Sequence, residues 1–235
     1  MTDPIIGTLN EHTLHLALKH YLEPDPAFHE VPCLGYVADI LRDGAITEVE
    51  TRSFANIRRK LAAFLGEYDV TVVYPVAVKK WVVWIDPETG EMSERHKSPK
   101  KGRPSDVLIE LLRLSDFLTN PRFRLRLIFL ETEEYKRRDG WSRDGKRGAT
   151  RQERVPLSFL GELLCERPRD YEKLVETIPE GSFTAAEFAA ANRLRGRFPW
   201  YALKILEQVG VIERDGLRGR AFLYRRRADD SIGRS

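Results

Sequence analysis

The order of strand-like and helix-like segments between residues 36 and 85 restricts the fold of this chain more than any other feature. Two short segments, YVADIL and AITEVET, have strand-forming composition and are joined by RDG, a turn signal. The next segment, SFANIRRKLAAFLGEY, changes to helical spacing, and VTVVYPV and WVVWID then read as two further strands. A strand, a helix and a strand in this order predict a βαβ crossover. We therefore expect an α/β fold with a mixed sheet flanked by helices.

The segments on either side of this region extend the pattern. Residues 8–22 have helical spacing, with one apolar face made of Leu14, Ala17, Leu18, Tyr21 and Leu22. Thr8 followed by Glu11 matches a capping box at the start of that helix. We expect another helix at residues 105–117 and a strand at residues 124–132. Residues 136–154 are basic and rich in glycine without periodicity, which predicts a long loop or connector.

The pattern changes again from residue 183. SFTAAEFAAANRL predicts a helix capped by Thr184, WYALKILEQVG predicts a second helix that ends at Gly210, and VIERDGLRGRAFLYRR predicts a hairpin. This arrangement resembles a winged helix domain, in which the second helix enters the major groove of DNA and the hairpin contacts phosphates. We expect an α/β core at residues 1–135, a basic connector and helical linker at 136–180, the winged helix domain at 181–228 and a disordered tail at 229–235.

Composition limits the class of protein. Of the 235 residues, 42% are hydrophobic and 32% are charged, which suits a globular chain with a charged surface. Cys33 and Cys165 are too few and too far apart for a disulfide framework or a zinc site, so we expect both to be buried. No secretory signal opens the sequence, and VTVVYPVAV is about half as long as a membrane span. We expect a soluble, cytoplasmic protein with no membrane partner.

Basic residues are concentrated in two places. The segment RHKSPKKGR contains no acid, and residues 193–227 hold ten Lys or Arg against three acids. Such clusters are the electrostatic footprint of a polyanion partner, although a solvated surface is the alternative. We expect double-stranded DNA as the partner, contacted by Lys97, Lys100, Lys101, Arg103, Arg193, Arg195, Arg197, Lys204, Arg218 and Arg220.

The first two strands carry carboxylates among apolar neighbours. Alternation places Glu48, Glu50 and Arg52 on one face of the second strand, and a hairpin brings Asp39 beside Glu48. Two carboxylates there repel unless a cation or a proton joins them. Mg²⁺ commonly binds one or two carboxylates, so we expect Mg²⁺ or Mn²⁺ at this point. The alternative is a solvent-facing edge where Glu48 and Glu50 pair with arginines.

A helix with Glu11, a strand with Asp39, a strand with Glu48 and then a helix and a strand together resemble the PD-(D/E)XK nuclease core over residues 9–78. The resemblance implies a restriction-endonuclease-like fold and metal ligands at Asp39, Glu48 and Glu11. Glu11 is alternatively explained by the capping box. The chain also resembles uncharacterised bacterial proteins with a VEIQTR-like strand and a C-terminal helix-turn-helix, a likeness that implies no activity.

One motif position departs from the family pattern. Glu50 stands where the motif has lysine. An E-x-E motif resembles certain restriction endonucleases, in which the second Glu serves as general base. Arg52 or Lys80 would then supply the missing cation.

The resemblance implies Mg²⁺-dependent endonuclease activity on DNA, with Glu50, Arg52 and Lys80 as catalytic residues. Two other functions remain open. One is a non-catalytic DNA-binding regulator whose degenerate nuclease fold serves dimerisation or effector binding, and the other is an RNA-processing factor. His12 and His15 have the spacing of helical metal ligands, but no third zinc ligand is evident and a core or surface role is preferred.

Overall fold

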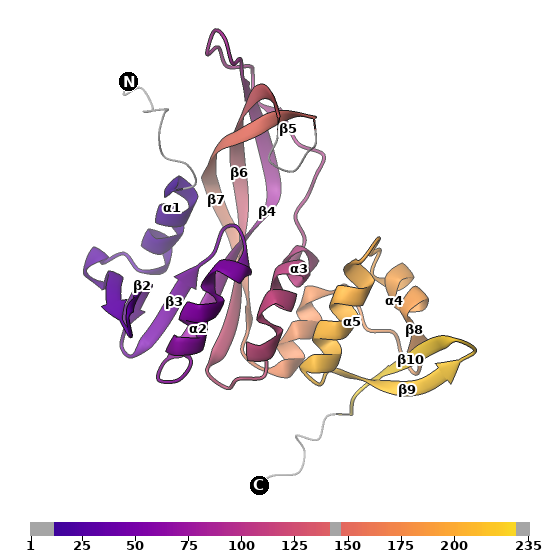
Figure 1. The fold of residues 1–235 in the computed structure, drawn as a ribbon. Helices are drawn as coiled ribbons and strands as arrows, with labels where there is room; N and C mark the ends of the chain where they lie inside the picture. Colours follow the sequence, from indigo (N-terminus) through magenta and orange to yellow (C-terminus); the bar gives the residue numbers. More distant parts are fainter. Residues whose placement is uncertain (1–11, 142–146, 229–235) are drawn as a thin grey trace. The chain divides into compact units, whose positions relative to one another are not determined.

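The computed structural model describes residues 12–141 and 147–228 (Figure 1). The chain divides into two compact units. Unit 1 consists of Met1–Arg52, Val73–Arg103 and Leu127–Glu162, and unit 2 of Ser53–Val72, Pro104–Arg126 and Leu163–Ser235. Three long strands contribute residues to both: β4 (Asp69–Ile85), β6 (Phe123–Trp141) and β7 (Arg147–Cys165). The units are therefore interleaved along the sequence.

The large sheet has the strand order β1-β2-β3-β4-β6-β7, with β5 (His96–Lys97) paired to β4. Its first three strands, β1 (His29–Cys33), β2 (Tyr36–Arg42) and β3 (Ala45–Val49), are antiparallel neighbours. Asp43 and Gly44 form the tight turn between β2 and β3, with φ of 50° and 74°. Asp-Gly suits such a turn because both positions need positive φ. The expected α/β class and the mixed sheet flanked by helices are confirmed.

Helix α1 (His12–Leu22) covers part of this sheet in unit 1. Leu14 and Leu18 are fully buried and pack with Val49, Val73 and Leu130. The helix expected at residues 8–22 is confirmed from residue 12 onward, whereas the Thr8–Glu11 capping box lies outside the described residues. The short helix η1 (Pro26–Phe28) then leads into β1.

One residue of the expected apolar face of α1 behaves differently. Tyr21 is 48% exposed, and its ring stacks on Phe159 of β7 with centroids 3.8 Å apart.

The first helices of unit 2 agree with the sequence. Helices η2 (Phe54–Ile57) and α2 (Arg58–Phe64) occupy the segment expected to be helical. A single helix was expected at residues 105–117, but three short pieces lie there: η3 (Pro104–Val107), α3 (Leu108–Leu111) and η4 (Leu112–Phe117). The break is at Leu114, which leaves helical geometry with φ −111° and ψ 15°.

The C-terminal part of unit 2 contains η5 (Pro168–Leu174), β8 (Phe183–Thr184), α4 (Ala185–Ala191), α5 (Phe198–Gln208), β9 (Ile212–Arg218) and β10 (Ala221–Arg226). Thr184 caps α4 in a capping box with Glu187, and Gly210, with φ 77°, follows the end of α5. The three strands form a small sheet in the order β8-β10-β9. The two expected helices and the hairpin are confirmed.

Several expectations about strands were wrong. Strand β1 was not anticipated, because HEVPC is short and contains Pro32. The two strands expected at residues 70–86 are one continuous strand, β4. The loop expected at residues 136–154 is largely strand, since β6 runs to Trp141 and β7 begins at Arg147. Residues 142–146 of that segment lie outside the described residues.

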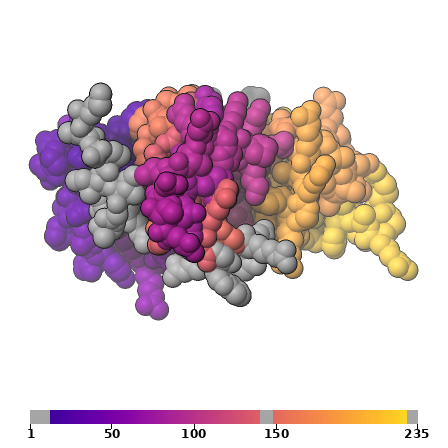
Figure 2. Space-filling model, turned by 90° about the horizontal axis from the view of Figure 1, so that it is seen from above, coloured from indigo at the N-terminus to yellow at the C-terminus, as the bar shows by residue number. Residues whose placement is uncertain are grey.

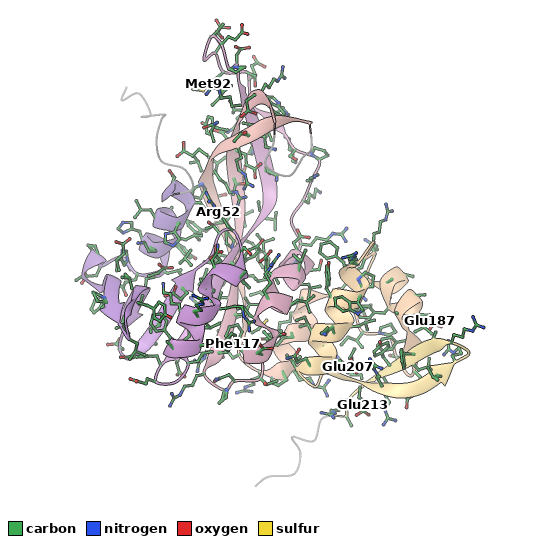
Figure 3. All side chains as sticks on the ribbon, in the orientation of Figure 1. Arg52, Met92, Phe117, Glu187, Glu207 and Glu213 are labelled. Carbon is green, nitrogen blue, oxygen red and sulfur yellow. The ribbon has the colours of Figure 1, made fainter. Side chains whose placement is uncertain are left out.

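The outer parts of β4, β5, β6 and β7 form an extension of the sheet in unit 1, which we call the arm (residues 79–101, 131–141 and 147–154) (Figure 1). Figure 3 shows Met92 at its outer end, where Met92 makes an isolated bridge with Ile85. Figure 2 looks along the arm and shows its magenta and salmon segments at the surface. Charged residues on both faces of the arm explain why no apolar periodicity marks these strands.

Two other expectations can be compared with the structure. Cys33 and Cys165 are both free and buried, as expected, and burial raises the pKa of the Cys165 thiol to about 12. Across the described residues, no helix is long and apolar enough to cross a membrane.

Candidate functional site

Asp39 and Glu48 face each other where the β2–β3 hairpin leaves its regular ladder. The last regular pair toward this end is Ile40 with Thr47, and Asp39 and Glu48 are the next residues. The Asp39 N–H donates to Glu48 Oε1 at 3.2 Å, and the Val49 N–H donates to Asp39 Oδ2 at 2.8 Å. Side-chain carboxylates thus accept amide protons that backbone carbonyls accept elsewhere in the ladder. The hairpin therefore places Asp39 and Glu48 opposite each other on neighbouring strands, with each side chain bonded to the backbone of the other strand.

Burial distinguishes this pair from surface carboxylates. Glu48 is only 1% exposed, and the Asp39 side chain is 19% exposed. Helix α1 places His15 above Asp39, with its Nε2 atom 3.3 Å from Asp39 Oδ2. Taking carboxylates out of water is costly unless hydrogen bonds or opposite charges compensate. The alternative of a solvent-facing edge is therefore wrong for Glu48.

A buried lysine lies beside these residues on α1. Lys19 is 3% exposed, and its ammonium donates to Glu30 Oε1 at 2.7 Å. This hydrogen bond holds the pKa of Glu30 below its ordinary value of 4.5, while the negative charge of Asp39 acts in the opposite direction and His15 acts with Lys19. The four side chains therefore belong to one electrostatic cluster.

The backbone at Glu30 supports a special role for this cluster. Glu30 has φ 53°, in the left-handed region that a residue with a Cβ seldom adopts. Sequence reasoning did not select Lys19 or Glu30 and gave His15 a core or surface role. The available signal was a Lys and a His four residues apart on the helix that carries the apolar stripe.

Glu50 and Arg52 lie beyond the end of β3, which stops at Val49. The Glu50 N–H donates to the Val73 carbonyl at 2.9 Å, and the Arg52 N–H donates to Glu50 Oε1 at 2.8 Å. The regular strand therefore ends before these two residues, although Glu50 still bonds to β4. Figure 3 labels Arg52 at this point.

The remaining candidates from the sequence are placed elsewhere. Lys80, on β4 in the arm, has its ammonium 3.4 Å from Glu134 Oε1 on β6. Glu11 lies outside the described residues. Over residues 12–141 and 147–228, no three His, Cys, Asp or Glu side chains form a group that would hold a metal ion. Asp39 and Glu48 supply two carboxylates, which is the number that Mg²⁺ commonly takes from a protein.

Comparison with known proteins places the chain in a family. The model of a family described as "Domain of unknown function (DUF8091)" matches residues 12–166, which is more than half of the chain. The chain belongs to the DUF8091 family. The matched range begins with α1 and ends just after β7, so it contains His15, Asp39, Glu48 and the arm.

A relative and the solved structures complete the comparison. An "Uncharacterized protein" of Treponema pallidum (strain Nichols) is 32% identical over 228 residues, which cover 94% of this chain and 87% of that protein. No solved structure matches the chain.

Several basic residues of the DUF8091 range lie in β5 and in the loop that follows it. Lys97 lies in β5 opposite Trp81, and Lys100, Lys101 and Arg103 are exposed. The Lys100 N–H donates to Ser98 Oγ at 3.3 Å. The loop is attached to β4, because the Ser98 N–H donates to the Lys80 carbonyl and the Gly102 N–H to the Ala77 carbonyl.

The two tryptophans of the arm contact charged residues. Trp81 donates its Nε1–H to Glu131 at 2.6 Å and lies under Arg95. Lys136 and Arg138 lie over Trp84, whose ring also stacks on His96. Both rings are thus part of side-chain contacts along the arm.

Beyond the DUF8091 range, the expected DNA contacts fall into two groups. Arg218 pairs with Glu187 at 2.7 Å and Arg193 with Glu176 at 3.8 Å, so their charges are matched by nearby carboxylates (Figure 3 labels Glu187). A second group has no ion pair within the part of the chain that the structure describes: Arg195, Arg197, Lys204 and Arg220. Lys204 lies over the ring of Trp200, which is 57% exposed on α5.

Proposed function

We propose that this DUF8091 protein is a metal-dependent nuclease that hydrolyses phosphodiester bonds of DNA, with Asp39 and Glu48 as the ligands of Mg²⁺ or Mn²⁺. One observation carries the proposal: two carboxylate residues occupy opposite positions on neighbouring strands, and one of them is 1% exposed. Converging carboxylates favour a cation or a shared proton.

The bound metal would polarise the scissile phosphate and lower the pKa of a coordinated water. Glu50, just past the end of β3, is the proposed general base. Arg52 and Lys80 are proposed cations for the developing charge on the phosphate. The buried ammonium of Lys19, in the same cluster as Asp39, is a further candidate for the cation that the motif lysine supplies elsewhere.

The C-terminal part of unit 2 is the proposed DNA-docking module. Its order of β8, two helices and the β9–β10 hairpin, with the sheet order β8-β10-β9, supports a winged helix arrangement. Helix α5 would enter the major groove. Arg195 and Arg197, which precede α5, together with Lys204 on α5, are the basic residues proposed to contact phosphates or base edges.

One observation favours the alternative of a non-catalytic DNA-binding regulator. Both carboxylates accept amide protons from the neighbouring strand, which is a structural role that needs no metal. In that case Asp39 and Glu48 shape the hairpin, and the nuclease-like core serves dimerisation or effector binding.

Cleavage of plasmid DNA with and without Mg²⁺ or Mn²⁺ separates these two functions. Asp39→Asn should lower the rate by at least about 10³-fold, since a metal contributes several kcal/mol of transition-state stabilisation. Asp43→Asn is the matched control, because Asp43 lies in the turn of the same hairpin with its side chain 89% exposed, and Asn tolerates its positive φ. Equal nicking by parent and Asp39→Asn protein would refute the assignment.

A further inference from the structure

Three cations surround one carboxylate on the arm. Glu134 is 3% exposed, and its carboxylate oxygens lie 3.4 Å from Lys80 Nζ, 3.4 Å from Lys136 Nζ and 3.5 Å from Arg154 Nε. The cations come from three neighbouring strands, β4, β6 and β7. One carboxylate cannot neutralise three cations, so the cluster retains two positive charges in excess.

The cluster also retains hydrogen-bonding capacity. Within the described residues, the buried Nε–H of Arg154 has no hydrogen-bond acceptor, because its approach to Glu134 lacks hydrogen-bond geometry. The Oγ1 atom of Thr132, two residues before Glu134 on β6, is buried and also has no partner. A buried donor without an acceptor is costly, and roughly 90% or more of such groups are satisfied in native structures. An anion bound here would supply the missing acceptor.

Solvent can reach the cations even though Glu134 is buried. The side chains of Lys80, Lys136 and Arg154 are 20%, 29% and 15% exposed. Alternate residues of a strand share one face, so Thr132, Glu134 and Lys136 lie on the face of β6 that carries Leu130. Leu130 packs with Leu14 and Leu18 of α1, which also carries His15 toward Asp39. The cluster therefore continues the side of the sheet on which the carboxylate site is built.

We propose that Lys80, Lys136 and Arg154 form a binding site for a backbone phosphate of DNA, with Glu134 holding the three cations together when no phosphate is bound. The choice of DNA as the source of the phosphate rests on the proposed nuclease function. Arg154 offers Nε–H and its terminal N–H groups, and Lys80 and Lys136 add point charges, a combination suited to phosphate oxygens. The site would hold the substrate strand beside the carboxylates, with Lys136 and Arg154 serving binding alone.

The test measures binding of a short labelled DNA duplex to the full chain in EDTA, across a salt series. The double variant Lys136→Gln/Arg154→Gln removes two cations and leaves Glu134 paired with Lys80. The matched control is Lys79→Gln/Arg137→Gln, which removes the same charge from the same arm. Lys79 pairs instead with Glu131, and Arg137 donates to the Pro87 carbonyl. The cluster variant should bind about tenfold more weakly than the control, with a salt slope lower by about 1 for each phosphate that is no longer neutralised.

Glu134→Gln separates a phosphate site from a structural ion-pair cluster. Because the carboxylate competes with the phosphate for the three cations, its removal should tighten DNA binding several-fold. A cluster that serves only to stabilise the arm gives unchanged or weaker binding. Three results would each overturn the proposal. They are unchanged or weaker binding by Glu134→Gln, equal losses of affinity in the cluster and control variants, and a parent chain that does not bind the duplex. The chain could also bind DNA through the cluster and yet fail to cleave it with Mg²⁺. That outcome would contradict the nuclease function and still support the phosphate site.

Discussion

The charged residues of unit 1 and those of the C-terminal hairpin in unit 2 are arranged on different principles. In unit 1 they form uneven, partly buried clusters, such as three cations around Glu134 and a buried Lys19 beside an exposed Glu30. In the hairpin they form exposed pairs and small groups, such as Arg214 with Glu207, Arg218 with Glu187, and Glu213 with Arg225 and Arg227. A count of basic residues marks both regions, but the cluster in unit 1 gathers excess cations around a buried carboxylate.

The difference bears on where function is expected. Exposed pairs contribute about 0–1 kcal/mol each and are readily exchanged for solvent contacts. A buried ion depends on its partner, because water cannot replace the partner after its removal. Perturbed, partly buried clusters are also where functional sites concentrate. We therefore expect chemistry and phosphate binding in unit 1.

The largest effect on stability should come from the buried lysine. Glu30→Gln leaves the Lys19 ammonium in a buried position without a carboxylate, and we expect a loss of about 2 kcal/mol in unfolding free energy. Lys19→Met should cost less, because Glu30, with its side chain 70% exposed, is then solvated by water. In unit 2, Glu207→Gln should stay within about 0.5 kcal/mol. Urea unfolding of the three variants at pH 7 provides the measurement, and equal losses would remove the distinction between the regions.

Acid should abolish the loss of stability that Glu30→Gln causes. Since the pKa of Glu30 is depressed in the folded state, its contribution to stability is present above the ordinary value of 4.5 and is lost as pH falls through the lower folded-state pKa. The gap in unfolding free energy between the parent and Glu30→Gln should therefore close below pH 4.5. Urea unfolding repeated between pH 7 and about pH 3 checks this window. A gap that is unchanged at the acidic end would show that the ion pair is not its cause.

The two regions should also differ in their effects on DNA binding. Replacing Lys136 and Arg154 of the arm by Gln should weaken duplex binding about tenfold, or roughly 1.4 kcal/mol. Replacing Arg214 and Arg218 of the hairpin should weaken it less than about twofold, because each is already paired with a carboxylate. Anisotropy titrations at one fixed salt concentration suffice. A larger loss of affinity in the hairpin variant would reverse the assignment and make the hairpin the main phosphate contact.

The smallest predicted effect concerns the N-terminal cap of α4 in unit 2. Thr184→Ala removes the side-chain acceptor for the Glu187 N–H and should cost about 1 kcal/mol. Thr184→Ser keeps the hydroxyl and serves as the control. Thermal unfolding of both variants measures the difference, and equal melting temperatures would show that the capping box does not stabilise this helix.

The sequence predicted those parts of the fold whose local signals agree with their tertiary setting. Asp43-Gly44 fixed the hairpin, and with it the meeting of Asp39 and Glu48, because the turn and the strand alternation specify one register. Thr184 and Gly210 marked helix ends through their own backbone chemistry. These residues act locally, so a single sequence is enough to read them.

The features that were missed depend on distant contacts. Strands β6 and β7 extend into the arm, where charged side chains line both faces and no alternation of apolar residues remains. Lys19 on the apolar stripe of α1 gave no sign of its partner, since Glu30 lies beyond the breaker segment EPDPAF in the sequence. Glu134 lies just beyond the strand expected at residues 124–132, and Arg154 lies in the segment that was expected to be a loop. Such contacts depend on how the strands pair in the sheet, which the local composition of a segment does not reveal.

The most direct test of the nuclease proposal is a crystal structure of the protein with Mn²⁺, inspected for anomalous scattering. We expect a peak between the Asp39 and Glu48 carboxylates, within about 2.0–2.3 Å of one oxygen of each, as for hard cations of this size. A map with no peak there at saturating Mn²⁺, and with Glu48 and Asp39 still bonded to the Asp39 and Val49 amides, would contradict the metal site and leave the carboxylates with a structural role.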